Sequence, residues 1–169
     1  MKNLLLLSAL AVSSVAAAKS DPCKLLSPNE VAAALGTSTV TASTATNQDF
    51  PSCNFDFEGG ALQVSIITPA QKFLQGKTLL AFTQSGGDDN GGFKGLKTIA
   101  GLGDEAVGNS SKASTTVGKN TVTADIGTVL VRRGNSIILL LALANEPAAN
   151  SINDRSMQSL TRRALLRLH

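Results

Sequence analysis

Apolar and polar residues alternate on both sides of Glu58-Gly59-Gly60, and this pattern constrains the fold more than any other feature of the chain. Residues 53–57 and 61–67 are each typical of a β-strand with one buried and one solvated face. A two-residue turn at Gly59-Gly60 would join them as a hairpin with one apolar and one polar face. This turn predicts the apolar pairs Phe57 with Leu62, Phe55 with Val64 and Cys53 with Ile66, and the polar pairs Asp56 with Gln63 and Asn54 with Ser65.

A second hairpin is predicted within residues 126–143, with Gly134-Asn135 as its turn. Its strands are largely apolar on both faces, which is typical of central strands that are covered on both sides. The alternative is that one of these faces forms a homo-oligomer or partner surface. The turn pairs Val131 with Ile138 and Val129 with Leu140 on one face, and Leu130 with Leu139 and Thr128 with Leu141 on the other.

Three segments carry the signals of a helix start. Ser27-Pro28-Asn29-Glu30 combines a capping serine, a proline at the first helical position and a glutamate that closes a capping box, and Gly36 ends the helix after Leu35. Thr68-Pro69-Ala70-Gln71 has a similar pattern and opens a second helix toward Gln84. A third helix begins at residues 151–154, and its apolar stripe consists of Met157, Leu160, Ala164 and Leu168.

These elements predict an α+β fold, with an antiparallel β-sheet and about three α-helices packed mainly on one face. Residues 37–46 are rich in serine and threonine and indicate an edge strand or a loop. Residues 86–92 have the composition of a flexible loop. Because about 150 residues are typical of one domain, we expect a single domain over residues 19–169.

Residues 1–18 have the pattern of a secretory signal peptide: Lys2, an apolar run over residues 4–15 and the small residues 16–18. The apolar run is shorter than the roughly 20 residues that span a bilayer, and we expect no transmembrane segment. No lipid-attachment cysteine follows the cleavage site directly, because Ser20-Asp21-Pro22 precede Cys23. The chain is therefore predicted to be secreted or periplasmic.

Export changes the meaning of the two cysteines, Cys23 and Cys53. In an oxidising compartment an even number of cysteines usually forms disulfides, and two cysteines allow a single intramolecular pairing. Their spacing is not the Cys-x-x-Cys of redox sites. We expect a structural Cys23–Cys53 disulfide, with free or intermolecular thiols as the alternatives.

Composition excludes several functions. The 15 Lys and Arg residues exceed the 12 Asp and Glu residues only slightly and form no basic block, so nucleic-acid binding is not expected. The chain has one histidine, His169 at its end, which argues against a histidine triad or a histidine-rich metal site. We expect no catalytic, cofactor-binding or metal-binding residues and no cofactor.

Two motifs suggest ligands only weakly. Gly101-Leu102-Gly103-Asp104-Glu105-Ala106 fits the dinucleotide-binding pattern, with Asp125 at a suitable distance for a ribose. The segment Gly108-Asn109-Ser110-Ser111 would cut any helix there short, and the two acids would repel a pyrophosphate, so we expect a turn before a short strand. Asp88, Asp89 and Asn90 are calcium-type ligands but lack the EF-hand spacing, and we expect a solvated loop.

The last predicted helix carries four arginines. Cations near a helix C-terminus complement the helix dipole, which is the expected role here. The alternative is binding to anionic envelope polymers or lipid headgroups. The four residues are Arg155, Arg162, Arg163 and Arg167.

The order of the short motifs resembles a family of small exported bacterial domains, many of them actinobacterial lipoproteins, whose function is uncharacterised. The resemblance implies an envelope location, a disulfide and an α+β domain, and it implies no catalytic residues. This chain departs from the family by lacking the lipid-attachment cysteine. The matching segments are Asp21-Pro22-Cys23-Lys24-Leu25-Leu26-Ser27, Glu30-Val31, Leu35-Gly36, Cys53-Asn54-Phe55, Gly101-Leu102-Gly103-Asp104-Glu105-Ala106 and Val131-Arg132-Arg133-Gly134-Asn135.

The sequence thus favours a non-enzymatic exported domain that binds a protein or an envelope component. A homo-oligomer through the 126–143 hairpin is compatible with this prediction. The alternatives are a secreted hydrolase that uses two converged carboxylates and a carrier of a small apolar ligand between sheet and helices.

Overall fold

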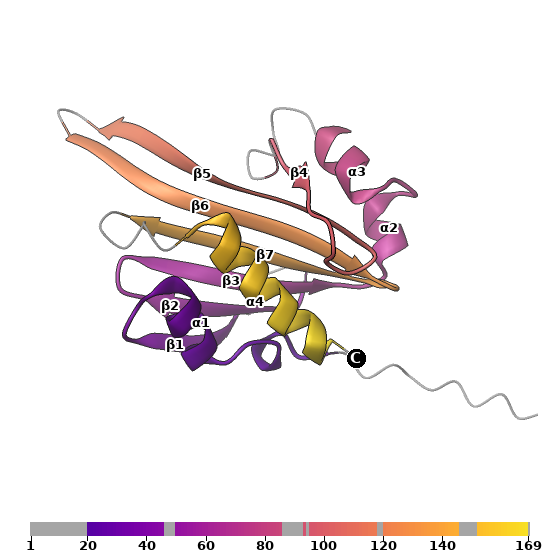
Figure 1. Cartoon of the computed structure of the whole chain (residues 1–169), viewed down its shortest axis with the longest axis horizontal. Coiled ribbons are helices and arrows are strands. Elements are labelled where there is room, and N and C mark those ends of the chain that lie inside the picture. The colour runs from indigo at the N-terminus through magenta and orange to yellow at the C-terminus, as the bar shows by residue number, and fades with distance from the viewer. Residues whose placement is uncertain are drawn as a thin grey trace, which may run out of the picture.

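A computed structural model describes residues 20–45, 50–85, 93, 95–117, 120–145 and 152–168. Within these residues a seven-stranded antiparallel sheet has the strand order β1-β2-β3-β7-β6-β5-β4 (Figure 1). The α+β class expected from the sequence is confirmed. The strands are β1 Val40–Ala45, β2 Ser52–Phe57, β3 Gly60–Ile67, β4 Lys97–Thr98, β5 Glu105–Val117, β6 Asn120–Arg133 and β7 Ser136–Asn145; the helices are the 3-10 turn η1 Pro22–Lys24, α1 Pro28–Leu35, α2 Ala70–Leu74, α3 Leu79–Ser85 and α4 Asp154–Arg167.

The helices lie on both faces of the sheet. The face that we call the helix face packs against α1 and α4, and buries the larger apolar cluster, which includes Phe55, Val64 and Leu140. The short helices α2 and α3 cover one end of the opposite face, where their apolar residues meet Ile67, Val107, Leu130 and Ile137 (Figure 1). The expected packing on one face therefore holds for α1 and α4 but not for α2 and α3.

The first hairpin forms with the expected faces but in a different register. Phe57 pairs with Gly60, and the turn consists of Glu58 and Gly59 rather than Gly59 and Gly60. Gly59 takes the positive φ of 77°, whereas Gly60 lies within β3, where an added Cβ would clash with the ring of Phe57. A shift of two residues preserves both faces, because side chains alternate with a period of two. The corrected pairs are Phe55 with Leu62, Cys53 with Val64, Asn54 with Gln63 and Asp56 with Ala61.

The second hairpin has the predicted register and the predicted central position. Val131 pairs with Ile138 and Leu130 with Leu139, and β7 lies between β3 and β6. Cover on the side away from the helix face is incomplete: Leu141 is half-buried, and Leu143 is 50% exposed. Val122 of β6, on that same side, is 45% exposed. Oligomerisation through this hairpin stays a prediction.

The first predicted helix is confirmed as α1. The Ser27 hydroxyl accepts a hydrogen bond from the Glu30 amide at 3.3 Å, and the Ser27 amide donates to Glu30 Oε2 at 2.8 Å. Gly36 follows the helix with a φ of 70°. This is the reciprocal capping that the sequence predicted.

The second predicted helix is wrong as a single element, because the chain breaks it into α2 and α3. Gln75 and Gly76 have positive φ values of 53° and 77° and end α2. Thr78 then provides a new cap, since its hydroxyl accepts a hydrogen bond from the Ala81 amide at 3.1 Å. The Leu79 amide donates to Glu105 Oε1 at 2.7 Å, which ties α3 to the start of β5.

The third predicted helix is α4, and its cap is Asn153. The Asn153 side chain accepts a hydrogen bond from the Ser156 amide at 3.1 Å. Met157, Leu160 and Ala164 of the predicted stripe are buried against the sheet. Leu168 follows the helix and is half-buried.

The remaining predictions have mixed outcomes. Within residues 37–46 an edge strand forms, β1. The Cys23–Cys53 disulfide is present, joins η1 to β2 and spans 5.0 Å between the two Cα atoms. None of the helices among the described residues is long and apolar enough to cross a membrane. The predicted signal peptide, the 86–92 loop with Asp88, Asp89 and Asn90, and His169 lie outside the described residues.

Candidate functional site

The start of α4 leaves part of the helix face open above β5. Gly127 of β6 allows α4 to approach closely, because an added Cβ would lie 2.8 Å from Ile152 Cγ2 and 2.9 Å from Met157 Cγ. The helix therefore rests on β6 and β7. On the neighbouring strand β5 the residues that face the same side include Gly108 and Ser110, which are too small to fill the space.

Two adjoining cavities occupy this space, and we call them together the α4 groove. Their volumes are about 340 and 360 Å³, within the range of small-molecule sites. Asp154 borders both cavities. The first is lined by Lys97, Thr98, Ile99, Ala100, Gly108, Asn109, Val129, Asp154 and Gln158; the second is lined by Ser110, Ser111, Lys112, Asp125, Ile152, Asn153 and Asp154.

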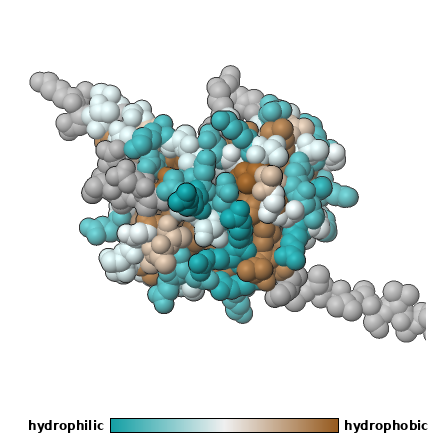
Figure 2. All heavy atoms as spheres, in the orientation of Figure 1, coloured by the Kyte–Doolittle hydropathy of each residue, from teal (hydrophilic) through white to brown (hydrophobic). Residues whose placement is uncertain are grey.

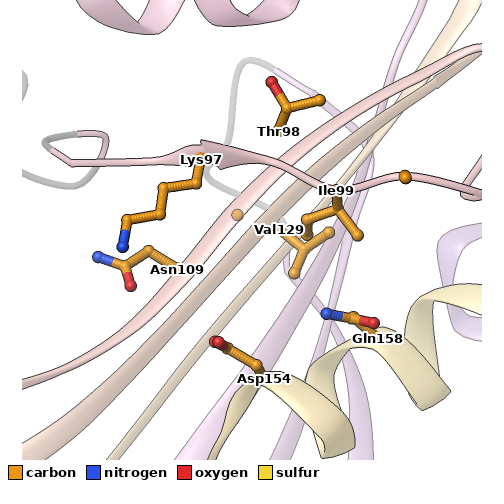
Figure 3. Close-up of a pocket in the computed structure, with 9 residues that line it drawn as sticks. Lys97, Thr98, Ile99, Asn109, Val129, Asp154 and Gln158 are labelled. Carbon is orange, nitrogen blue, oxygen red and sulfur yellow. The ribbon is translucent and has the colours of Figure 1, made fainter.

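The first cavity combines an apolar floor with a polar rim. Figure 3 shows Asp154 and Gln158 extending from α4 toward Val129 of β6 and Ile99, which directly follows β4. Lys97 enters from β4, at the edge of the sheet (Figure 3). A carboxylate, an amide and an ammonium group therefore border one small cavity, which fits a polar ligand better than an apolar one.

The second cavity contains the one buried carboxylate among the described residues. Asp125 is 5% exposed, and Lys112 Nζ lies 3.5 Å from its Oδ1. The two residues face each other across β5 and β6 in the sheet register. Asp125 Oδ1 accepts no hydrogen bond, and the buried Ser110 Oγ has no hydrogen-bond partner.

The described groove residues do not form a recognisable catalytic arrangement. A serine nucleophile needs a base within hydrogen-bond reach, and Ser110 Oγ has none among the described residues. Asp154 is exposed and Asp125 is ion-paired with Lys112, so the pair differs from two carboxylates that share a buried site. No cluster of three or more His, Cys, Asp or Glu side chains that could hold a metal occurs in the described part of the chain.

The dinucleotide-like motif forms a turn that leads into β5, as predicted from the sequence. Gly101 and Gly103 have φ values of 74° and 57°, and no helix opens there. The Gly134 amide donates to Asp104 Oδ2 at 2.6 Å, which fastens the turn to the second hairpin. The following strand is long rather than short, and Asp125 lies away from this turn, in the α4 groove.

The arginines of α4 have different roles. Arg167, in the last turn, binds Glu30 of α1 with two hydrogen bonds and also donates to the Leu25 carbonyl at 3.0 Å. The hydrogen bonds from Arg167, with smaller contributions from Ser27, lower the pKa of Glu30 from its ordinary value of 4.5 to about 2. Arg155 and Arg162 are exposed.

On the helix side of the molecule hydrophilic side chains predominate, with hydrophobic ones visible between them (Figure 2).

The groove residues were not predicted from the sequence. The sequence pattern suggests a ligand role only for Asp125, as a ribose partner, and none for Ser110 or Lys112. The available signal was local: small residues alternate along β5 at Ala106, Gly108 and Ser110, which leaves room above the strand if a helix stops short of it. Whether a helix does so depends on packing between distant segments.

No protein-family model and no curated protein matches the chain. A solved structure from Bacteroides thetaiotaomicron VPI-5482 is similar over 66% of this chain and 39% of its own length, with 9% identity and a TM-score of 0.37. LpqN of Mycobacterium tuberculosis, described as involved in cell envelope biogenesis, is similar over 76% of this chain and 80% of its own length, with 14% identity and a TM-score of 0.26. At such TM-scores neither likeness supports an argument about fold or function.

Proposed function

We propose that this chain is an exported, non-enzymatic binding domain whose ligand site is the α4 groove. The observation that carries the proposal is Asp125, a buried carboxylate that borders a small-molecule-sized cavity and whose Oδ1 accepts no hydrogen bond. Buried polar groups in proteins are normally satisfied, so an acceptor without a hydrogen bond beside a cavity calls for an explanation, and a ligand that donates to it supplies one.

Binding explains the groove better than catalysis does. The acceptors Asp125 and Ser110 lie on two long paired strands rather than on loops, which suits recognition. The secreted hydrolase with two carboxylates is the competing function, and Asp125 with Asp154 is the pair that it would use. The polar lining of the first cavity argues against a carrier of apolar ligands.

Export is part of the proposal. The disulfide is typical of chains that fold in an oxidising compartment. Residues 1–18 serve as the signal peptide and residues 19–169 as the exported domain. An envelope component that carries polar or charged groups is then the natural class of ligand, and the resemblance to exported bacterial domains agrees with it.

Changes in the backbone amide NMR chemical shifts of the purified protein, measured during ligand titrations, test this function. The protein is titrated separately with L-alanine, methylammonium chloride, sodium acetate and N-acetylglucosamine. We expect saturable shifts confined to the α4 groove with at least one probe, and their loss in Ser110→Leu, which fills the second cavity. Ser114→Leu, at an exposed position of β5, is the matched control and should bind as the wild type does.

Three outcomes would count against the proposal. Shifts confined to another surface would place the site elsewhere. The absence of any saturable shift would leave the groove without a role in binding these classes of ligand. Cleavage of a glycosidic or ester substrate that is lost in both Asp125→Asn and Asp154→Asn would favour the hydrolase.

A further inference from the structure

The side-chain carboxyl group of Asp125 is almost inaccessible to solvent. It is 5% exposed, and no hydrogen bond reaches its Oδ1. An ionised group in such a place is costly unless donors surround it. Asp125 therefore has unused acceptor capacity beside the second cavity of the α4 groove.

Two further oxygen acceptors border the same cavity. Ser110 pairs with Gly127 while Lys112 pairs with Asp125, so Ser110 is the diagonal neighbour of Asp125 on the same face of the sheet. The Ser110 Oγ is buried and has no hydrogen-bond partner. Asp154 adds a carboxylate from the first turn of α4. Three acceptors match the three N–H donors of a primary ammonium group.

The charges around the cavity also favour a cation. Asp125 and Asp154 contribute two negative charges, and Lys112 contributes one positive charge. The N-terminus of α4 adds only about half a positive charge. Once Lys112 is displaced, the lining carries about one and a half negative charges, and a monovalent cation would offset most of them.

Lys112 is suited to give way to such a cation. Its ammonium lies 3.5 Å from Asp125 Oδ1 without a hydrogen bond to that atom, and its side chain is 56% exposed. Exposed lysines hold their partners weakly, because the stem is flexible and water screens the charge. A bound ammonium group can replace this contact and donate hydrogen bonds to Asp125 Oδ1 and Ser110 Oγ, neither of which has a hydrogen-bond partner.

We propose that the second cavity binds a primary ammonium group, with Asp125 as its charged acceptor and Ser110 as a neutral one, and that the ligand displaces Lys112 from Asp125. This inference rests on the proposed function, since it names the chemistry that the α4 groove recognises. The ligand class is a small molecule or polymer that carries a free primary amine.

The test compares three salts on the purified protein through the backbone amide shifts of Ser110, Gly127 and Asp125. Methylammonium chloride supplies the charge and three N–H donors, tetramethylammonium chloride supplies the charge alone, and sodium acetate has the opposite charge. We expect saturable shifts with methylammonium and much weaker ones with the other two, because the site requires both charge and donors.

Two variants and a control assign the binding to named residues. Asp125→Asn should raise the dissociation constant of methylammonium by about tenfold or more, since it removes the charged acceptor. Lys112→Met should lower it by about threefold or more, because it removes the resident cation. Asp56→Asn, exposed on the opposite face, should leave it unchanged. The amide spectrum of each variant also shows whether it is folded.

The outcomes separate this inference from the proposed function. Equal binding of tetramethylammonium, unchanged affinity in folded Asp125→Asn, or weaker binding in folded Lys112→Met would overturn the ammonium assignment. Binding of L-alanine, acetate or N-acetylglucosamine in the groove would then still support a binding domain. If neither these probes nor methylammonium shifts any groove amide, both proposals fail.

Discussion

Arg167 and Glu30 join the two helices of the helix face through a pair of hydrogen bonds. Arg167 Nη1 donates to Glu30 Oε2 at 2.6 Å and Nη2 donates to Oε1 at 2.8 Å. Arg163 adds a longer contact of 3.4 Å to the same carboxylate. Because Glu30 also closes the capping box of α1, one side chain couples the start of α1 to the end of α4.

The Glu30 carboxylate should make stability depend on pH in the acid range. Arg167 lowers the pKa of Glu30 to about 2 in the folded chain, below its ordinary 4.5, so the stabilisation is present above about pH 4.5 and is lost as the pH falls toward 2. Glu30→Gln keeps a side chain able to cap Ser27 but removes the charge. We expect it to lower the free energy of unfolding at pH 7 by about 1–2 kcal/mol, a value reduced for the solvent screening of the half-exposed Arg167.

Urea unfolding at several pH values measures this effect. The difference in free energy of unfolding between the wild type and Glu30→Gln should decrease steadily as the pH falls from 4.5 to 2. Glu58→Gln, at the exposed turn of the first hairpin, serves as the control and should show little difference at any pH. A Glu30→Gln difference that stays constant down to pH 2 would contradict the role assigned to the ion pair.

The disulfide should stabilise the chain mainly by restricting its unfolded state. Cys23 and Cys53 are 30 residues apart, and the chain-entropy model gives a stabilisation of about 3–4 kcal/mol for a loop of this length. We expect the double variant Cys23→Ser, Cys53→Ser to unfold at a lower urea concentration, with a free energy of unfolding that is smaller by about this amount. Intact mass of the unreduced protein should be two hydrogens below the reduced value. Two thiols that react with iodoacetamide in unreduced, denatured protein would refute the bond.

Gly127 should be intolerant of a side chain. Alanine there would crowd Ile152 and Met157, which lie within 3 Å of the added Cβ, and overpacking of this kind costs about 1–3 kcal/mol. Thermal unfolding of Gly127→Ala, Met157→Ala and the double variant gives the coupling between the two positions. We expect the double variant to be more stable than the sum of the single effects predicts. If the effects of the two single substitutions on stability simply add, Gly127 and Met157 are not in close contact.

The predicted homo-oligomer can be tested at Leu143. This residue is 50% exposed on the side of the second hairpin away from the helix face. Leu143→Asp should change the free energy of unfolding by less than about 0.5 kcal/mol, because the site is on the surface. If two copies meet through this hairpin, the variant should sediment as a monomer where the wild type does not. Leu166→Asp, on α4 and 78% exposed, is the control and should sediment as the wild type does. A wild type that is monomeric at all concentrations would contradict the predicted homo-oligomer.

The sequence predicted those features that depend on neighbouring residues. The capping box of Ser27 and Glu30, the turn at Gly134 and the face of each strand in the first hairpin all follow from local pattern. The register of that hairpin was wrong, because Gly60 is needed within the strand, where β7 and Phe57 approach it closely. A pattern within one hairpin contains no information about the third strand.

The break between α2 and α3 and the α4 groove were missed for related reasons. Gln75 ends α2 in a left-handed conformation that a non-glycine residue seldom adopts. The groove exists because Gly127 brings the start of α4 onto β6, while β5 beside it presents Gly108 and Ser110. These residues are far apart in the chain, and their relation emerges only after the sheet is assembled.

The ammonium site is tested most directly by the dissociation constant of methylammonium for the wild type and for Asp125→Asn, read from the amide chemical shift of Ser110. The groove as described predicts saturable binding to the wild type and an increase of about tenfold or more in the variant, with Asp56→Asn unchanged. The same dissociation constant in the wild type and in a folded Asp125→Asn variant would show that Asp125 is not the charged acceptor of this site.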